Sequence, residues 1–197
     1  MKTTLLNIAI IWIIHYFCLG ADKLFDTLDD PISRGWIDPL ASESYFQYYC
    51  ALFLSGWFHM NILHNIANTI LLFITIPNIE TILSASHIWM IGFIGNIIST
   101  FVCTIIPISI DSYAIGASTR AYIYIPIALY TILRNNNYRT KFDIAVIIIL
   151  IFNILKEGII LFVTFMKGYK IYNETNIAHS ASIILGSILT ILIHVNL

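Results

Sequence analysis

Charged side chains are scarce in this sequence of 197 residues, where Asp, Glu, Lys and Arg together make up 11%. About a quarter of the residues in a soluble domain are charged, so this composition excludes an ordinary soluble protein. The formal net charge is -1 and no block of basic residues occurs, which excludes an electrostatic attraction to nucleic acid. Hydrophobic residues instead make up 58% of the chain. The composition therefore predicts a multi-pass protein embedded in the lipid bilayer.

Cysteine is also rare. Cys18, Cys50 and Cys103 lie far apart and do not have the spacing of a metal site. A free cysteine in an apolar run packs as a small hydrophobic residue. We therefore assign no function to these cysteines and predict neither a metal nor a cofactor.

Long apolar runs are abundant. A hydrocarbon core about 30 Å thick needs about 20 apolar residues per helix. Six stretches reach or approach that length, namely 4–20, 50–76, 88–107, 113–133, 143–166 and 176–195. We therefore predict an all-α polytopic membrane protein, a bundle of six transmembrane helices in which residues 1–197 form a single domain.

Basic residues near the helix ends predict the orientation. Arg134, Arg139 and Lys141 lie together between the fourth and fifth stretches, and such a loop is usually cytoplasmic. The N-terminus is then cytoplasmic as well, although Lys167 and Lys170 fall on the outer side and oppose this assignment. Because the chain has neither long tails nor an organellar transit segment, we expect the bacterial inner (plasma) membrane.

Unusual polar residues occur near the outer ends of the second, fourth and sixth stretches. They are His59, His64 and Asn68 in the second, Gly116 and Ser118 in the fourth, and His179 in the sixth. Counting residues at about 1.5 Å each places Ser118 and His179 within about 10 Å of the outer surface. The three groups therefore share one depth, as a single site requires.

Helical spacing predicts which of these side chains face one another. His64 and Asn68 are four residues apart and share a face, as do Ser118 and Tyr122. His59 precedes His64 by five residues and turns away from it if the helix already runs there, which favours a place in the entry turn or at the rim. Downstream of His179, the small residues Ser182 and Gly186 predict a close helix contact.

A serine and a histidine at one depth provide the groups that acyl transfer needs. Serine is a weak nucleophile until a base takes its proton, and imidazole is the usual base. Asn and His side chains can donate to the oxyanion that forms. No carboxylate is expected at this depth to orient His179, so the sequence predicts a dyad in place of the three-residue template.

Three strings in order, "HMNILHNIAN", "GAST" and "AHSASIILG", resemble the rhomboid intramembrane serine proteases, and the resemblance covers the chain from roughly residue 50 onward. The resemblance implies that Ser118 is the nucleophile and His179 the general base and acid. It also implies an oxyanion hole formed by His64, Asn68 and the Ser118 amide, with Tyr122 stacked on the His179 ring.

The implied activity is that of an intramembrane serine endopeptidase, which cleaves single-span or membrane-anchored proteins near the outer membrane boundary. Three alternatives stay open: rhombosortase-type processing of C-terminal sorting tails, weakly suggested by the pair Lys156 and Glu157; a catalytically silent rhomboid-like protein that binds clients; and a small transporter. A transporter predicts inverted repeats, and the sequence has no convincing repeat. The sequence predicts no particular oligomeric state.

The chain departs from the family pattern at several positions. Thr119 replaces the second glycine of the serine motif, Ser182 replaces the first glycine of the last helix, and Arg120 follows in an unusual place. The bulkier Thr119 is expected to restrict packing beside the serine, which bears on activity more than on fold. Lys156 and Glu157 are adjacent in sequence, point in different directions and need not pair.

Overall fold

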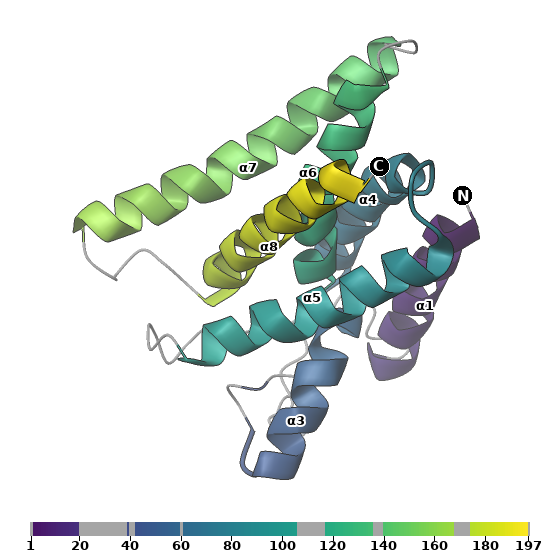
Figure 1. Cartoon of the computed structure of the whole chain (residues 1–197). Helices are drawn as coiled ribbons and strands as arrows, with labels where there is room; N and C mark the ends of the chain where they lie inside the picture. The colour runs from purple at the N-terminus through teal and green to yellow at the C-terminus, as the bar shows by residue number, and fades with distance from the viewer. Residues whose placement is uncertain are drawn as a thin grey trace.

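The chain folds into α-helices throughout the part that the structure, a computed structural model, describes (Figure 1). The described residues are 2–19, 39, 42–59, 61–105, 117–135, 140–167 and 174–196. Within them lie α1 (Lys2–Leu19), α3 (Tyr45–Leu54), the short 3-10 helix η2 (Ser55–Trp57), α4 (Ile62–Ile79), α5 (Ala85–Ile105), α6 (Ser118–Arg134), α7 (Lys141–Lys167) and α8 (Glu174–Asn196). The predicted all-α class is confirmed.

Four helices, α4, α5, α7 and α8, are long and apolar enough to cross a membrane, and α1 is a shorter apolar helix. Helices suit a bilayer because they satisfy their backbone hydrogen bonds internally. Large apolar side chains point outward from α7, including Phe152 and Phe162, which are 64% and 65% exposed. The chain is therefore an integral membrane protein, and these outward side chains face lipid.

The stretch 50–76 is not one helix, contrary to the prediction from its apolar composition. The chain ends α3 at Leu54, passes through η2, and begins α4 only at Ile62. The Asn61 side chain accepts the backbone N–H of His64 at 2.9 Å and so caps the start of α4. His59 consequently lies between two helices, where helical spacing does not apply.

Helix α6 lies at the centre of the bundle. It contacts α4, α5, α7, α8 and η2, whereas α7 and α1 lie on opposite sides of the molecule (Figure 1). Every residue from Ser118 to Ala128 is buried. Because α6 is enclosed by other helices, its polar side chains must find partners within the protein.

The α6–α8 contact is close because α8 presents small residues to its neighbours. A methyl group added at Gly186 would collide with the backbone carbonyl oxygen of Ile123 on α6. One turn earlier, the Ser182 hydroxyl lies 2.8 Å from the Ser99 hydroxyl on α5. The predicted small-residue seam of α8 is therefore present, and Ser182 adds a polar link where a glycine would add none.

Arg120 is a structural cation inside the bundle. Its guanidinium donates to the Gly56 carbonyl oxygen at 2.7 Å and to Asn7 Oδ1 at 3.3 Å. It also lies over the Trp57 ring, 3.8 Å from the centroid. Hydrogen bonds and a cation–π contact thus replace water around the buried charge and tie α6 to η2 and α1.

Thr119 is accommodated without exposure. It is buried, and its hydroxyl donates to Asn96 Oδ1 on α5. The Asn96 amide in turn donates to the Leu52 carbonyl oxygen at 3.2 Å. Thr119, the residue that replaces a glycine, therefore points toward α5 and links α5 to α6.

Candidate active site

A cavity of about 410 Å³ opens where α4, α6, α7 and α8 meet. Its lining residues are His64, Ala67, Asn68, Ile70, Leu71, Ile74, Ser118, Tyr122, Ile149, Asn153, Lys156 and His179. Four of the residues that the sequence placed at one depth on three helices thus line one cavity: His64, Asn68, Ser118 and His179. Its remaining walls are largely apolar, as expected of a site that receives a hydrophobic segment.

Ser118 is the first residue of α6, and its side chain lines the cavity. The preceding residue, Ala117, gives the helix no side-chain cap. The N-terminus of a helix carries a partial positive charge and N–H groups that favour an anion. A negative charge that develops next to Ser118 would therefore be stabilised by the helix.

His59 supports the start of α6 and does not lie at the rim. It is 1% exposed, its Nε2 accepts the Ala117 N–H at 3.3 Å, and its ring centroid lies 5.2 Å from that of His64. Burial, followed by the charge of His64, lowers the pKa of His59 well below its usual value. Residue 59 lies in the turn before α4, the place that the helical spacing favoured, and because the chain is not helical there His59 does not turn away from His64.

His179 is held on both its flat face and one edge. The Tyr122 ring stacks on it with centroids 3.9 Å apart and an angle of 6° between the planes. Its Nδ1 lies 3.1 Å from Glu157 Oε1. Its other nitrogen, Nε2, is buried and has no hydrogen-bond partner among the described residues. The nitrogen without a partner is therefore the one available for a proton from another group.

A carboxylate does lie beside His179, which corrects the expectation of a site without one. Glu157 on α7 is 1% exposed and reaches the imidazole from the next helix. Lys156 Nζ also lies 2.8 Å from Glu157 Oε1, so the two adjacent residues pair after all. The Cα–Cβ bonds of Lys156 and Glu157 point in different directions, but the long and flexible lysine side chain bends back far enough to reach the carboxylate of Glu157.

Asn68 and His64 on α4 line the same cavity as Ser118 and His179, and both side chains carry N–H groups. Asn68 is 4% exposed, and its side-chain Nδ2 has no hydrogen-bond partner among the described residues. A buried amide N–H without a partner costs free energy unless a ligand uses it. Asn68 thus has a donor without a partner at the cavity wall, and His64 lines the same cavity one turn earlier.

Gly116 lies outside the described residues. Among the described residues, no group of three or more His, Cys, Asp or Glu is placed to hold a metal ion.

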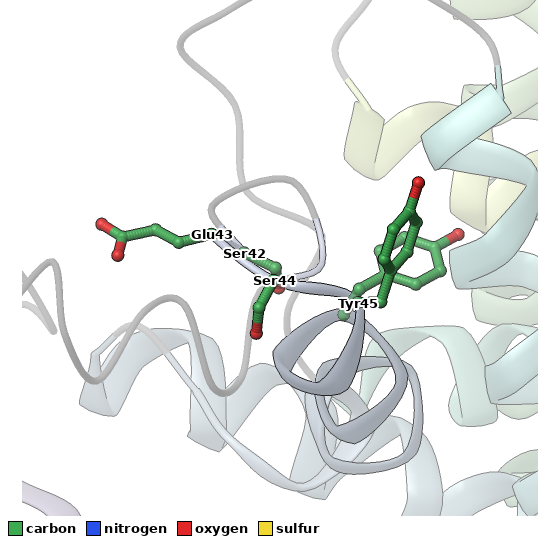
Figure 2. Close-up of a pocket in the computed structure, with 5 residues that line it drawn as sticks. Ser42, Glu43, Ser44 and Tyr45 are labelled. Atoms are coloured by element: carbon green, nitrogen blue, oxygen red, sulfur yellow. The ribbon is translucent and has the colours of Figure 1, made fainter.

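A second hollow of about 330 Å³ lies at the start of α3, lined by Ser42, Glu43, Ser44, Tyr45 and Tyr48. Figure 2 shows the Glu43 carboxylate pointing away from α3. The Ser44 hydroxyl is occupied as the helix cap, because it accepts the Gln47 N–H at 3.2 Å. The hollow has no histidine in its lining and so lacks a base for its serines.

Fold and site together define a multi-pass α-helical membrane protein with a serine and a histidine in one cavity within the bundle. The model of the Rhomboid domain matches residues 46–196, so the chain belongs to the rhomboid family. That family consists typically of intramembrane serine proteases, which act on membrane-embedded substrates within the bilayer. A comparison with curated proteins finds no match for this chain.

Proposed function

We propose that the protein is an intramembrane serine endopeptidase in which Ser118 is the nucleophile and His179 the general base and acid. The observation that carries the proposal is the single cavity that both side chains line together with Asn68 and His64. No cofactor enters the proposed reaction. Residues 1–197 would act as one catalytic domain.

The proposed reaction starts with attack of Ser118 Oγ on the scissile carbonyl carbon, while His179 Nε2 takes the hydroxyl proton. The contact of Nδ1 with Glu157 supports this assignment, because it leaves Nε2 for Ser118. The resulting oxyanion would be held by the Asn68 amide, the His64 ring and the Ser118 N–H. His179 then gives its proton to the leaving amine, and water, activated by the same imidazole, hydrolyses the acyl-enzyme.

The surroundings of the cavity support a proposed class of substrate. Apolar side chains of α4 and α7, such as Ile70, Ile74 and Ile149, line the approach to the polar cluster. A substrate helix would have to unwind there, because its carbonyl groups are otherwise occupied by its own hydrogen bonds. We therefore propose that the substrates are single-span or membrane-anchored proteins, cut near the outer membrane boundary in a bacterial plasma membrane, with the N-terminus of the protease in the cytoplasm.

Co-expression with a panel of single-span proteins tests the proposal, and the panel should include a protein anchored by a C-terminal sorting tail. We expect cleavage by the wild type and none by Ser118→Ala or His179→Ala. Ser187→Ala and His87→Ala serve as matched controls, because both side chains are exposed and lie outside the cavity. Cleavage that persists in Ser118→Ala would contradict the nucleophile assignment, and preference for the tail would identify the sorting-tail subgroup.

A further inference from the structure

The buried carboxylate of Glu157 is the feature that a serine–histidine dyad does not use. An acidic side chain inside a membrane helix is expensive unless both its oxygens have partners. Here Oε1 contacts His179 Nδ1 at 3.1 Å and Lys156 Nζ at 2.8 Å, and Oε2 accepts from Asn176 Nδ2 at 3.1 Å. Every oxygen is occupied, and two of the three contacts go to α8. The carboxylate is therefore fixed against the helix that carries the base.

We infer that Glu157 is a positioning residue for His179, so that the site operates as a Ser118–His179–Glu157 triad. This inference rests on the proposed function. A carboxylate at Nδ1 accepts the Nδ1–H, keeps the lone pair of Nε2 directed at the nucleophile, and stabilises the imidazolium that forms when Nε2 takes the serine proton. No other carboxylate contacts this ring among the described residues.

Lys156 contacts both side chains that pack against the imidazole of His179, Tyr122 and Glu157. Its ammonium donates to the Tyr122 hydroxyl at 3.0 Å as well as contacting Glu157. The Tyr122 hydroxyl donates onward to Asn153 Oδ1 at 3.0 Å. One lysine thus connects the ring stacked on His179 with the carboxylate at its edge and balances the charge of that carboxylate inside the bundle.

The titratable groups around His179 come from four helices. Lys156 and Glu157 face it from α7, Tyr122 from α6, and His64 from α4 across the cavity. On α5, Cys103 packs with the residues that precede His179 on α8. Only Glu157 contacts Nδ1 among the described residues, so Glu157→Gln removes the one carboxylate that this nitrogen meets.

Two measurements on the full-length protein in detergent test the inference. Nitrogen-15 NMR of labelled histidines, with His179 assigned by its absence in His179→Ala, reports the tautomer. Cleavage kinetics across pH report kcat and KM. In wild type we expect the proton on Nδ1, and in Glu157→Gln a mixture of tautomers. We also expect kcat to fall by about 10²- to 10⁴-fold with little change in KM. The reason is that His179 is no longer held with Nε2 free to take the proton of Ser118.

Glu43→Gln is the matched control, because it makes the same chemical change at an exposed carboxylate that points away from α3 (Figure 2). Should Glu157→Gln fail to fold because Lys156 is left without its partner, the double variant Lys156→Gln, Glu157→Gln removes both charges and still breaks the triad. We expect the same mixture of tautomers in it.

An unchanged Nδ1–H tautomer together with a kcat within about twofold of wild type would overturn the triad. The tautomer measurement needs no substrate. If the wild type cleaves nothing, the proposed function fails, while the tautomer still shows whether Glu157 orients His179. The two failures are therefore distinguishable.

Discussion

The Tyr122 ring lies flat against the imidazole of His179, with the ring centroids 3.9 Å apart. Tyr122 follows Ser118 by one turn on α6, whereas His179 belongs to α8. The helix that carries the proposed nucleophile therefore also fixes the plane of the proposed base. The stack requires α6 and α8 to pack closely, so we expect the small residues between them to bear on the proposed activity as well as on stability.

Substituting Tyr122 tests the stack. Tyr122→Phe keeps the ring, and we expect kcat within about threefold of wild type. In Tyr122→Ala the ring is lost, and because an aromatic pair contributes about 0.5–1.5 kcal/mol, we expect kcat to fall by about 2- to 12-fold. Cleavage of a fluorescent membrane-anchored substrate measures both. Equal losses in the two variants would mean that the hydroxyl group matters and the stack does not.

Substituting Asn68 tests the oxyanion donor. We expect Asn68→Ala to lower kcat by about 10²- to 10³-fold with KM nearly constant, because the donor acts mainly on the charge of the transition state. Asn78→Ala is the matched control on the same helix, since its amide donates to the Ile74 carbonyl oxygen of its own helix. A loss that appears in KM alone would argue against an oxyanion role.

His59 makes stability depend on pH. An unfolded histidine has a pKa of about 6.5, and the pKa of His59 in the folded protein is lower, so the unfolded chain takes up the proton first as the pH falls. Its contribution to stability is complete above about pH 6.5 and is lost progressively below that value. His59→Gln keeps an acceptor for the Ala117 N–H but does not titrate.

Thermal unfolding in detergent between about pH 7 and pH 5 measures this difference. We expect the midpoint of wild type to fall more steeply with acidification than that of His59→Gln. Parallel curves for the two proteins would show that His59 takes up its proton equally well in the folded state.

Two glycines allow a matched test of helix packing. In Gly186→Ala the new methyl group meets the Ile123 carbonyl oxygen, so we expect a loss of about 1–3 kcal/mol in stability. A methyl group at Gly158 on α7 meets nothing within 4 Å, and alanine favours a helix by up to about 1 kcal/mol, so Gly158→Ala should be neutral or stabilising. Thermal midpoints that rank the two variants the other way would contradict the packing described here.

The sequence predicted the class of fold and the convergence of the polar helices because both follow from simple counting. Apolar stretches near membrane length imply helices, and residues at equal distances from the helix ends lie at one depth. Ser118, His179, Asn68 and His64 were grouped in this way, and they line one cavity. The break before α4 was missed because "SGWFHMN" contains no charge, and an uncharged interruption does not stand out from its apolar surroundings.

The contact between Glu157 and His179 was missed for a different physical reason. Helix α7 has 27 residues, more than the roughly 20 that cross a bilayer, so counting inward from its outer end places Glu157 too deep to meet His179. A buried acid in a membrane helix was nevertheless a signal of function. Only the packing of α7 against α8 shows which group that acid meets.

The central claim is that Ser118 is a nucleophile activated by His179, and covalent labelling tests it most directly. The purified protein is treated with a fluorophosphonate, and the modified peptide is identified by mass spectrometry. We predict an adduct on Ser118 that disappears in Ser118→Ala and forms at least about 10²-fold more slowly in His179→Ala. A folded wild type that carries no adduct on Ser118, or labelling that proceeds at an unchanged rate in His179→Ala, would contradict the claim.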